Sequence, residues 1–130
     1  VTAEQLGELV DFISIDVAFI SLDKVLPVAT TLLKDTGALV ALIKPQFEAG
    51  KEKVGKGGIV RERAVHEEVL SRILQVAYDC KLYLHGLTFS PIKGTEGNIE
   101  FLGYFTKSEE GALSITDELI TAVVDEAHML

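Results

Sequence analysis

Two kinds of hydrophobic pattern divide this chain into expected strands and helices. Short apolar runs at 12–17 and 38–43 have the length and composition of strands buried on both faces of a parallel sheet. Apolar and polar residues alternate at 82–89 and again at 98–105, with a proline and glycines between the two segments. Alternating segments joined by such a turn predict an antiparallel hairpin.

Apolar side chains at helical spacing predict three helices between and after these strands. The first lies at 22–33 behind a capping Ser21, and Gly37 is expected to close it. The second lies at about 61–79, and the third follows Ser114–Asp117, which resembles a capping box. A strand, a helix and a further strand in succession form a right-handed unit with parallel strands. The expected fold is therefore α/β, with parallel strands that end in an antiparallel hairpin.

Charged side chains stand where the expected strands end. Asp16 closes the first apolar run, Lys44 closes the second, and Glu100 opens the last strand beside the connecting turn. Open α/β sheets bind ligands at the carboxyl ends of their parallel strands, so Asp16 and Lys44 are candidate site residues. The alternatives are a turn or N-cap role for Asp16, and for Lys44 a side chain that only extends its charge into solvent.

Size and composition indicate a single globular domain. The chain has 130 residues, of which 48% are hydrophobic, and no apolar run approaches the roughly 18 residues that a membrane span requires. The lone Cys80 excludes an internal disulfide and fits a reducing compartment, so a cytoplasmic location is expected. No metal-ligand cluster is predicted, and His66 is expected on the solvated side of its helix.

One basic, glycine-rich loop stands out from an acidic chain. The net charge is −8, yet six basic and three acidic residues fall between positions 44 and 63. An acidic protein with one local basic segment suits a limited phosphate contact rather than a broad nucleic-acid groove. The alternative is a lysine-rich loop that is merely solvated. The candidate RNA-binding residues are Lys51, Lys53, Lys56, Arg61 and Arg63.

Three short motifs resemble those of one protein family. They are Asp16–Leu22 (DVAFISL), Lys44–Gly50 (KPQFEAG) and Gly97–Phe101 (GNIEF), and they keep the order and approximate spacing found in the family. The chain thereby resembles the TlyA family, which is also called hemolysin A and is related to the FtsJ ribose 2′-O-methyltransferases of RNA. Ala18 stands where serine is usual in that family.

The resemblance implies a Rossmann-like fold, S-adenosylmethionine as the methyl donor, and ribosomal RNA or a ribosomal subunit as the partner. By motif match, the catalytic residues are Asp16, Lys44 and Glu100, and Asp16 and Val17 are expected at the cofactor. The family's first catalytic lysine, its glycine-rich cofactor loop and its S4-like domain have no counterpart here. Residues 1–130 are therefore expected to form a truncated, C-terminal part of a methyltransferase domain that is inactive alone.

The chemistry of ribose methylation gives Lys44 one of two roles. Its amine can remove the hydroxyl proton only if it is partly neutral, which burial or a second cation favours. Neighbouring carboxylates such as Asp16 and Glu100 stabilise the ammonium instead. Lys44 is thus expected to act as the base or, when charged, to orient the ribose hydroxyl for in-line attack.

Two other functions are alternatives to this interpretation. A membrane-active hemolysin is disfavoured, because the sequence has neither an apolar span nor a basic amphipathic helix. A non-catalytic fold fragment is the other alternative. It would self-associate, as a homodimer, through a strand edge that the missing first strands leave exposed.

Overall fold

The computed structural model describes residues 9–17, 20–49, 60, 62–90 and 98–129. Among these residues, no helix is long and apolar enough to cross a membrane. In chain order the elements are β1 (Val10–Ile15), α2 (Leu22–Leu32), β2 (Leu33–Ile43), α3 (Pro45–Glu48), α4 (Arg63–Asp79), β3 (Tyr83–Phe89), β4 (Phe101–Thr106) and α5 (Asp117–His128).

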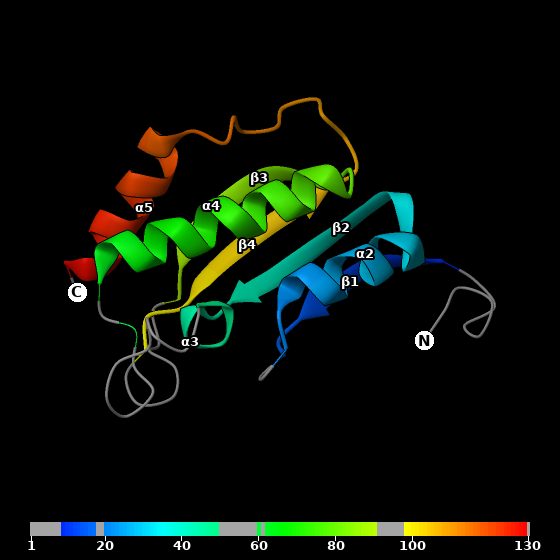
Figure 1. Cartoon of the computed structure of the whole chain (residues 1–130). Helices are drawn as coiled ribbons and strands as arrows, with labels where there is room; N and C mark the ends of the chain where they lie inside the picture. The colour runs from blue at the N-terminus through cyan, green and yellow to red at the C-terminus, as the bar shows by residue number, and fades with distance from the viewer. Residues whose placement is uncertain (1–8, 18–19, 50–59, 61, 91–97, 130) are drawn as a thin grey trace.

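The strands form one mixed sheet in the order β1-β2-β4-β3. The pair β1–β2 is parallel, whereas β4 runs antiparallel to both β2 and β3. Figure 1 shows α2 and α4 side by side in front of the sheet, with α5 beside α4. This arrangement confirms the predicted α/β fold, in which a parallel unit is followed by an antiparallel hairpin.

The core lies between this helical layer and one face of the sheet. Along β2, Leu39, Ala41 and Ile43 are fully buried, whereas the alternate residues such as Val40 are only half-buried. On the same side as Val40, the paired Tyr104 of β4 is exposed. The prediction of a strand buried on both faces was therefore wrong for the described residues, because their helices cover one face.

Gly37 does not close the first helix, contrary to the prediction. Helix α2 ends at Leu32 and β2 begins at Leu33, so Gly37 lies inside the strand. A Cβ atom at Gly37 would lie 2.5 Å from Leu33 Cδ1 and 2.9 Å from the Asp11 carbonyl oxygen of β1. Glycine is thus needed there so that a buried leucine and a neighbouring strand can approach the backbone.

The caps of two helices show how local sequence sets their starts. The Ser21 hydroxyl accepts from the Asp23 N–H at 3.2 Å, as predicted for the N-cap of α2. Helix α5, however, is capped by Thr116, whose hydroxyl accepts from the Leu119 N–H at 3.2 Å. The predicted capping box beginning at Ser114 was wrong, since the helix starts two residues later.

His66 is buried rather than solvated, which overturns the prediction for it. It is fully inaccessible to solvent, and its Nδ1 lies 2.8 Å from Nε2 of His128, while its Nε2 lies 3.1 Å from the Val60 carbonyl oxygen. Burial, and then the neighbouring His128, lower the pKa of His66 to about 4. The helical pattern of α4 did not reveal this environment, because α5 supplies it from far along the chain.

Candidate active site

The strand register brings the three predicted catalytic residues to one edge of the sheet. Ile15 of β1 pairs with Ala41, and Ile43 of β2 pairs with Phe101 of β4. Asp16 and Lys44 follow their strands directly and Glu100 directly precedes β4. Continuing the antiparallel register by one step sets Lys44 opposite Glu100, so the three residues lie at the same edge of the sheet.

Asp16 and Lys44 form an ion pair across the ends of β1 and β2. The Lys44 Nζ lies 2.5 Å from Asp16 Oδ1; the lysine side chain is 17% exposed and the aspartate side chain is 64% exposed. The Phe47 ring centroid lies 6.0 Å from the same Nζ. The pair therefore fixes the position of a largely covered ammonium group, while the carboxylate stays open to a ligand.

Glu100 is buried and is held by a residue that sequence reasoning did not identify. Its Oε2 accepts from Gln46 Nε2 at 2.9 Å, and its backbone carbonyl accepts from the Ser90 N–H at 2.8 Å. Gln46 follows Lys44 by two residues, within the second of the three motifs. Its place in that motif was the available signal, but no pattern indicated which side chain the amide would reach.

Glu48 is a second residue of that motif with an unexpected role. Its side chain is 3% exposed and accepts from the Ser21 hydroxyl at 2.5 Å, the Leu22 N–H at 2.8 Å and Arg72 Nη2 at 3.1 Å. Arg72 also donates to the Glu48 carbonyl oxygen at 2.7 Å. A carboxylate at the first turn of α2 is favourable because free N–H groups point toward it. Glu48 thus joins α3, α2 and α4 beneath the site.

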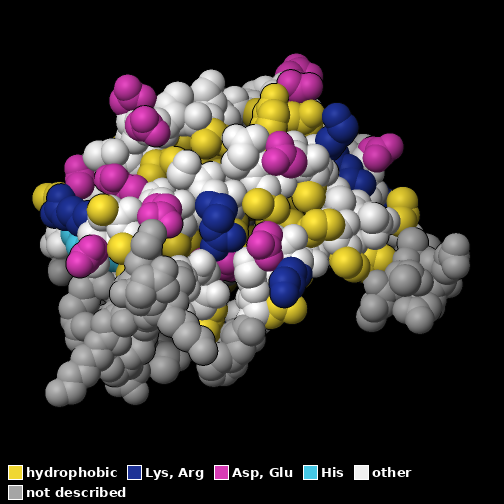
Figure 2. All heavy atoms as spheres, viewed as in Figure 1, with side chains coloured by type: hydrophobic (Ala, Val, Ile, Leu, Met, Phe, Trp, Pro, Cys, Tyr) yellow, Lys and Arg dark blue, Asp and Glu magenta, His cyan; other side chains and the backbone are white. Residues whose placement is uncertain are grey.

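Of the remaining predicted site residues, Arg63 and Val17 lie within the described part of the chain. Lys51, Lys53, Lys56 and Arg61 lie outside the described residues. Arg63 begins α4 and its Nη1 lies 2.8 Å from Asp125 Oδ1 of α5, so it is engaged between two helices. On the face in Figure 2, acidic and basic side chains are interspersed without a continuous basic field. Val17 is half-buried and packs against the core.

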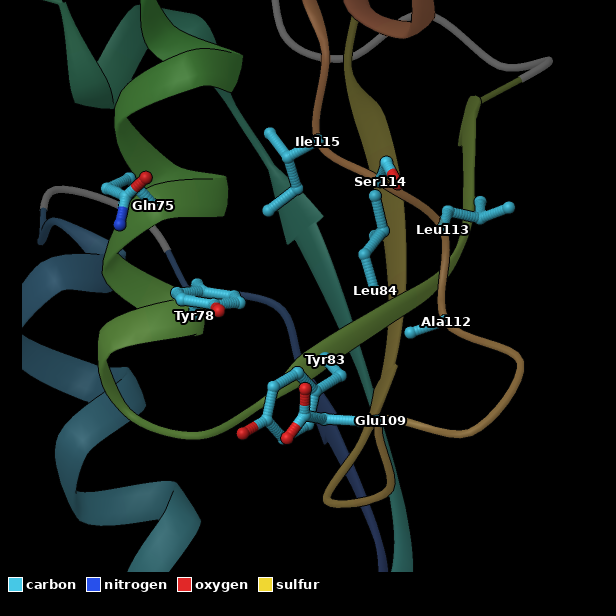
Figure 3. A pocket seen from close by; sticks show the side chains of 9 residues that line it. All are labelled: Gln75, Tyr78, Tyr83, Leu84, Glu109, Ala112, Leu113, Ser114 and Ile115. Atoms are coloured by element: carbon cyan, nitrogen blue, oxygen red, sulfur yellow. The ribbon is translucent and has the colours of Figure 1, made fainter.

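A cavity lies away from this site (Figure 3). It measures about 350 Å³ and is lined by Gln75 and Tyr78 of α4, Tyr83 and Leu84 of β3, Glu109 and residues 112–115. Tyr83 pairs with Thr106 at the far end of β4 from Glu100. Because it is a strand's length from Lys44, this cavity is separate from the catalytic candidates. Among the described residues, no group of three or more His, Cys, Asp or Glu is placed to hold a metal ion.

The chain is similar in sequence to a known family and to several of its members. The family described as FtsJ-like methyltransferase matches residues 1–107. The chain is 49% identical to YqxC of Bacillus subtilis, which carries a provisional rRNA methyltransferase name, over 91% of this chain and 43% of that protein. It is 34% identical to the 16S/23S rRNA (cytidine-2′-O)-methyltransferase TlyA of Mycobacterium tuberculosis, over 87% of this chain and 42% of that protein.

Solved structures give the same relationship. A protein from Streptococcus thermophilus, provisionally called a hemolysin, superposes with a TM-score of 0.87 at 45% identity, over 98% of this chain and 46% of that one. A similarly named protein from Lactococcus lactis gives a TM-score of 0.81 at 42% identity, over 91% and 56%. The chain spans less than half the length of the curated relatives it matches.

Proposed function

The chain belongs to the FtsJ-like methyltransferase family, and from this premise we propose that it carries the catalytic side chains of an S-adenosylmethionine-dependent ribose 2′-O-methyltransferase acting on ribosomal RNA. One observation carries the proposal: the Asp16–Lys44 ion pair lies beside Glu100 at the carboxyl end of the parallel strands. The relatives named as rRNA cytidine-2′-O-methyltransferases support the same substrate class.

Lys44 is the residue that handles the ribose hydroxyl in this proposal. While it is paired with Asp16, it is an ammonium that donates to the ribose oxygen and orients it. When it has lost a proton, the same nitrogen accepts the hydroxyl proton as the oxygen attacks. Both states use one position of Nζ, which the ion pair with Asp16 holds.

Glu100 supports Lys44 from the opposite strand. Gln46 fixes the orientation of the buried Glu100 carboxylate, so this charge stays at the start of β4. In the proposed mechanism, this charge stabilises the protonated lysine that forms after proton transfer. Asp16 and Glu100 therefore set the position and charge of Lys44 and do not react themselves.

S-adenosylmethionine supplies a methyl group that is activated by a positively charged sulfur. The described residues fit such a ligand, because the Asp16 carboxylate is largely exposed at the end of β1, where a cationic group is favoured. Asp16 and the adjacent Val17 are the proposed cofactor contacts of this chain. Lys51, Lys53, Lys56 and Arg61 are the proposed phosphate contacts, joined by Arg63 if it leaves Asp125.

The edge strand β1 is the proposed surface through which the chain pairs with a second copy. The chain covers 43% of YqxC, and β1 ends the sheet on one side. An apolar groove of about 620 Å³ runs between β1 and α2 along that edge. Residues 1–130 are accordingly proposed to be one part of a methyltransferase domain, inactive alone, that pairs with a second copy through this edge.

Methyl transfer to ribosomal RNA tests the proposed function. The chain is incubated with labelled S-adenosylmethionine and ribosomal RNA, alone and together with the part of YqxC that this chain does not match, supplied as a separate polypeptide. Ribose 2′-O-methylation is identified by resistance of the adjacent phosphodiester to alkali. We expect methylation only in the mixture of the two polypeptides, and we expect Lys44→Ala to remove at least about 99% of it, since the substitution deletes the group that handles the proton.

A matched control separates this effect from loss of an ion pair. Lys34 and Asp11 also bridge β2 and β1, at 3.1 Å, but near the opposite ends of these strands. Lys34→Ala is expected to leave methylation within about twofold of the wild type, because its exposed pair contributes little. Equal losses in the two variants, or methylation of a base in place of the ribose, would contradict the proposed function.

A further inference from the structure

Only one of the two polar atoms of the Gln46 side-chain amide forms a hydrogen bond within the described residues. Its Nε2 donates to Glu100 Oε2 at 2.9 Å, whereas its Oε1 is buried and has no hydrogen-bond partner among the described residues. A carboxylate oxygen accepts but cannot donate, so the amide nitrogen must face Glu100. This contact therefore also fixes where the amide oxygen lies.

The lone Oε1 differs from the polar groups around it. The nearby Glu48 carboxylate receives donors from Ser21, Leu22 and Arg72. A buried acceptor without a donor is costly, and such groups in a folded protein call for an explanation. Oε1 belongs to a residue two positions after Lys44 that also touches Glu100. A donor brought by a ligand at this site explains why the acceptor is left open.

We propose that Gln46 is a specificity-determining residue whose Oε1 accepts a hydrogen bond from the bound nucleotide while its Nε2 holds Glu100. The inference rests on the proposed function, because RNA supplies the donor. In a cytidine nucleotide two groups have the required chemistry, namely the ribose hydroxyl and the exocyclic amine. Either one satisfies the amide oxygen, and a nucleotide that lacks it leaves the oxygen unpaired.

Binding of three oligonucleotides distinguishes these donors. The probes are fluorescein-labelled oligocytidylate, oligouridylate and oligodeoxycytidylate, each about eight nucleotides long, measured by fluorescence anisotropy with the whole chain. Their phosphate charges are equal, so basic residues contribute alike to each. Uridine has a carbonyl in place of the cytidine amine, and the deoxy probe lacks the hydroxyl. We expect the wild type to bind oligocytidylate about tenfold more tightly than at least one of the others.

Two variants separate the acceptor of Gln46 from its donor. Gln46→Met removes both at similar length, whereas Gln46→Glu keeps an acceptor and loses the donor to Glu100. We expect the Met variant to bind the three probes with equal affinity, and the Glu variant to keep the preference while binding all of them more weakly. Loss of preference over oligouridylate identifies the amine as the partner, and loss over oligodeoxycytidylate identifies the hydroxyl.

The outcomes also separate this inference from the proposed function. If Gln46→Met weakens binding of all three probes by one factor and keeps the wild-type preference, Gln46 is only structural and the inference is overturned. The same holds if the wild type shows no preference. If the wild type binds none of the probes, RNA recognition by this chain fails, and the inference fails with it. Circular dichroism and thermal unfolding verify that each variant is folded.

Discussion

The Glu48 carboxylate accepts a hydrogen bond from the Leu22 backbone N–H at 2.8 Å, although 26 residues separate the two along the chain. The interaction joins the segment that follows Asp16 to the segment that follows Lys44. Since those two side chains form the ion pair of the candidate site, the contact fixes their supports relative to one another. Two of the sequence motifs are thus parts of one structural unit.

Removing the Glu48 carboxylate is expected to destabilise this unit strongly. Glu48→Ala leaves the first turn of α2 and the Arg72 guanidinium without their shared acceptor. We expect the free energy of unfolding to fall by about 3 kcal/mol, because a buried carboxylate that accepts from three donors is lost. Glu48→Gln keeps one acceptor oxygen and should lower the free energy of unfolding by about half as much. Urea unfolding followed by circular dichroism measures both changes.

An exposed ion pair between α4 and α5 provides the control. Asp125→Ala removes the partner of Arg63, and both side chains are about half exposed. Such pairs contribute at most about 1 kcal/mol. A Glu48→Ala variant no less stable than Asp125→Ala would show that the three donors to Glu48 do not hold the site together.

His66 makes stability depend on pH below neutrality. Its pKa is lowered from 6.5 to about 4 by burial, then by His128. Between these values the unfolded chain binds a proton that the folded chain does not, so stability falls as the pH falls from 6.5 toward 4. Above pH 6.5 this contribution is constant. The expected loss is about 3 kcal/mol across that window, measured by urea unfolding at several pH values.

Substituting His66 shows how much of this pH dependence of stability is due to that side chain. His66→Gln keeps a hydrogen-bonding side chain but removes the titration, so the decline in stability over this window should be reduced. His85, which lies 2.8 Å from the Ser108 carbonyl oxygen in an exposed contact, serves as the control. His85→Gln should leave the wild-type profile in place. An unchanged profile for His66→Gln would assign the dependence to other groups.

Gly37 should tolerate no larger side chain, although it lies inside a strand. In Gly37→Ala the new Cβ would meet Leu33 and the Asp11 carbonyl at less than 3 Å. We expect a loss of about 1–3 kcal/mol, as for other overpacked sites. At Gly86 a Cβ would lie 3.5 Å from Tyr104 Cβ, an ordinary contact. Gly86→Ala is therefore the matched control, and thermal unfolding of the two variants should differ clearly.

The strand ends could be predicted from the sequence because they depend on local pattern. A short apolar run followed by a charge and a proline identified Lys44 without knowledge of any neighbour, and the parallel unit then implied Asp16 beside it. The environments of His66 and Gln46 depend instead on residues 62 and 54 positions away. Hydrophobic periodicity reports which face of an element is buried, but not which side chain from another element covers it.

The start of β2 shows the same limit, because the local sequence there predicts a turn where the structure has part of a strand. Lys34, Asp35 and Thr36 are exposed and polar, and with Gly37 they have the composition of a turn. They nevertheless lie within β2, in an irregular stretch: β1 pairs with Leu33 and next with Ala38, so residues 34–37 have no partner in the β1 register. The buried Leu33 and its pairing with Val10 hold the start of the strand, and the local sequence does not reveal this contact.

Self-association through the β1 edge is the last expectation, and Phe12 is its most direct probe. The Phe12 side chain is 55% exposed and lines the apolar groove between β1 and α2. An exposed aromatic residue on an edge strand favours pairing with another chain. We expect sedimentation velocity to show a concentration-dependent dimer, and Phe12→Lys to raise its dissociation constant by at least about tenfold.

A substitution at the other edge of the sheet tests whether that effect is local. Leu113 is 41% exposed, and its N–H donates to the Leu84 carbonyl oxygen of β3 at 2.7 Å, so residues beyond β4 shield that edge. Leu113→Lys adds the same charge there and should leave the dimer unchanged. A wild type that stays monomeric at every concentration would remove the proposal of a homodimer. Equal weakening by both lysines would instead indicate that added positive charge, not loss of the β1 contact, disrupts the dimer.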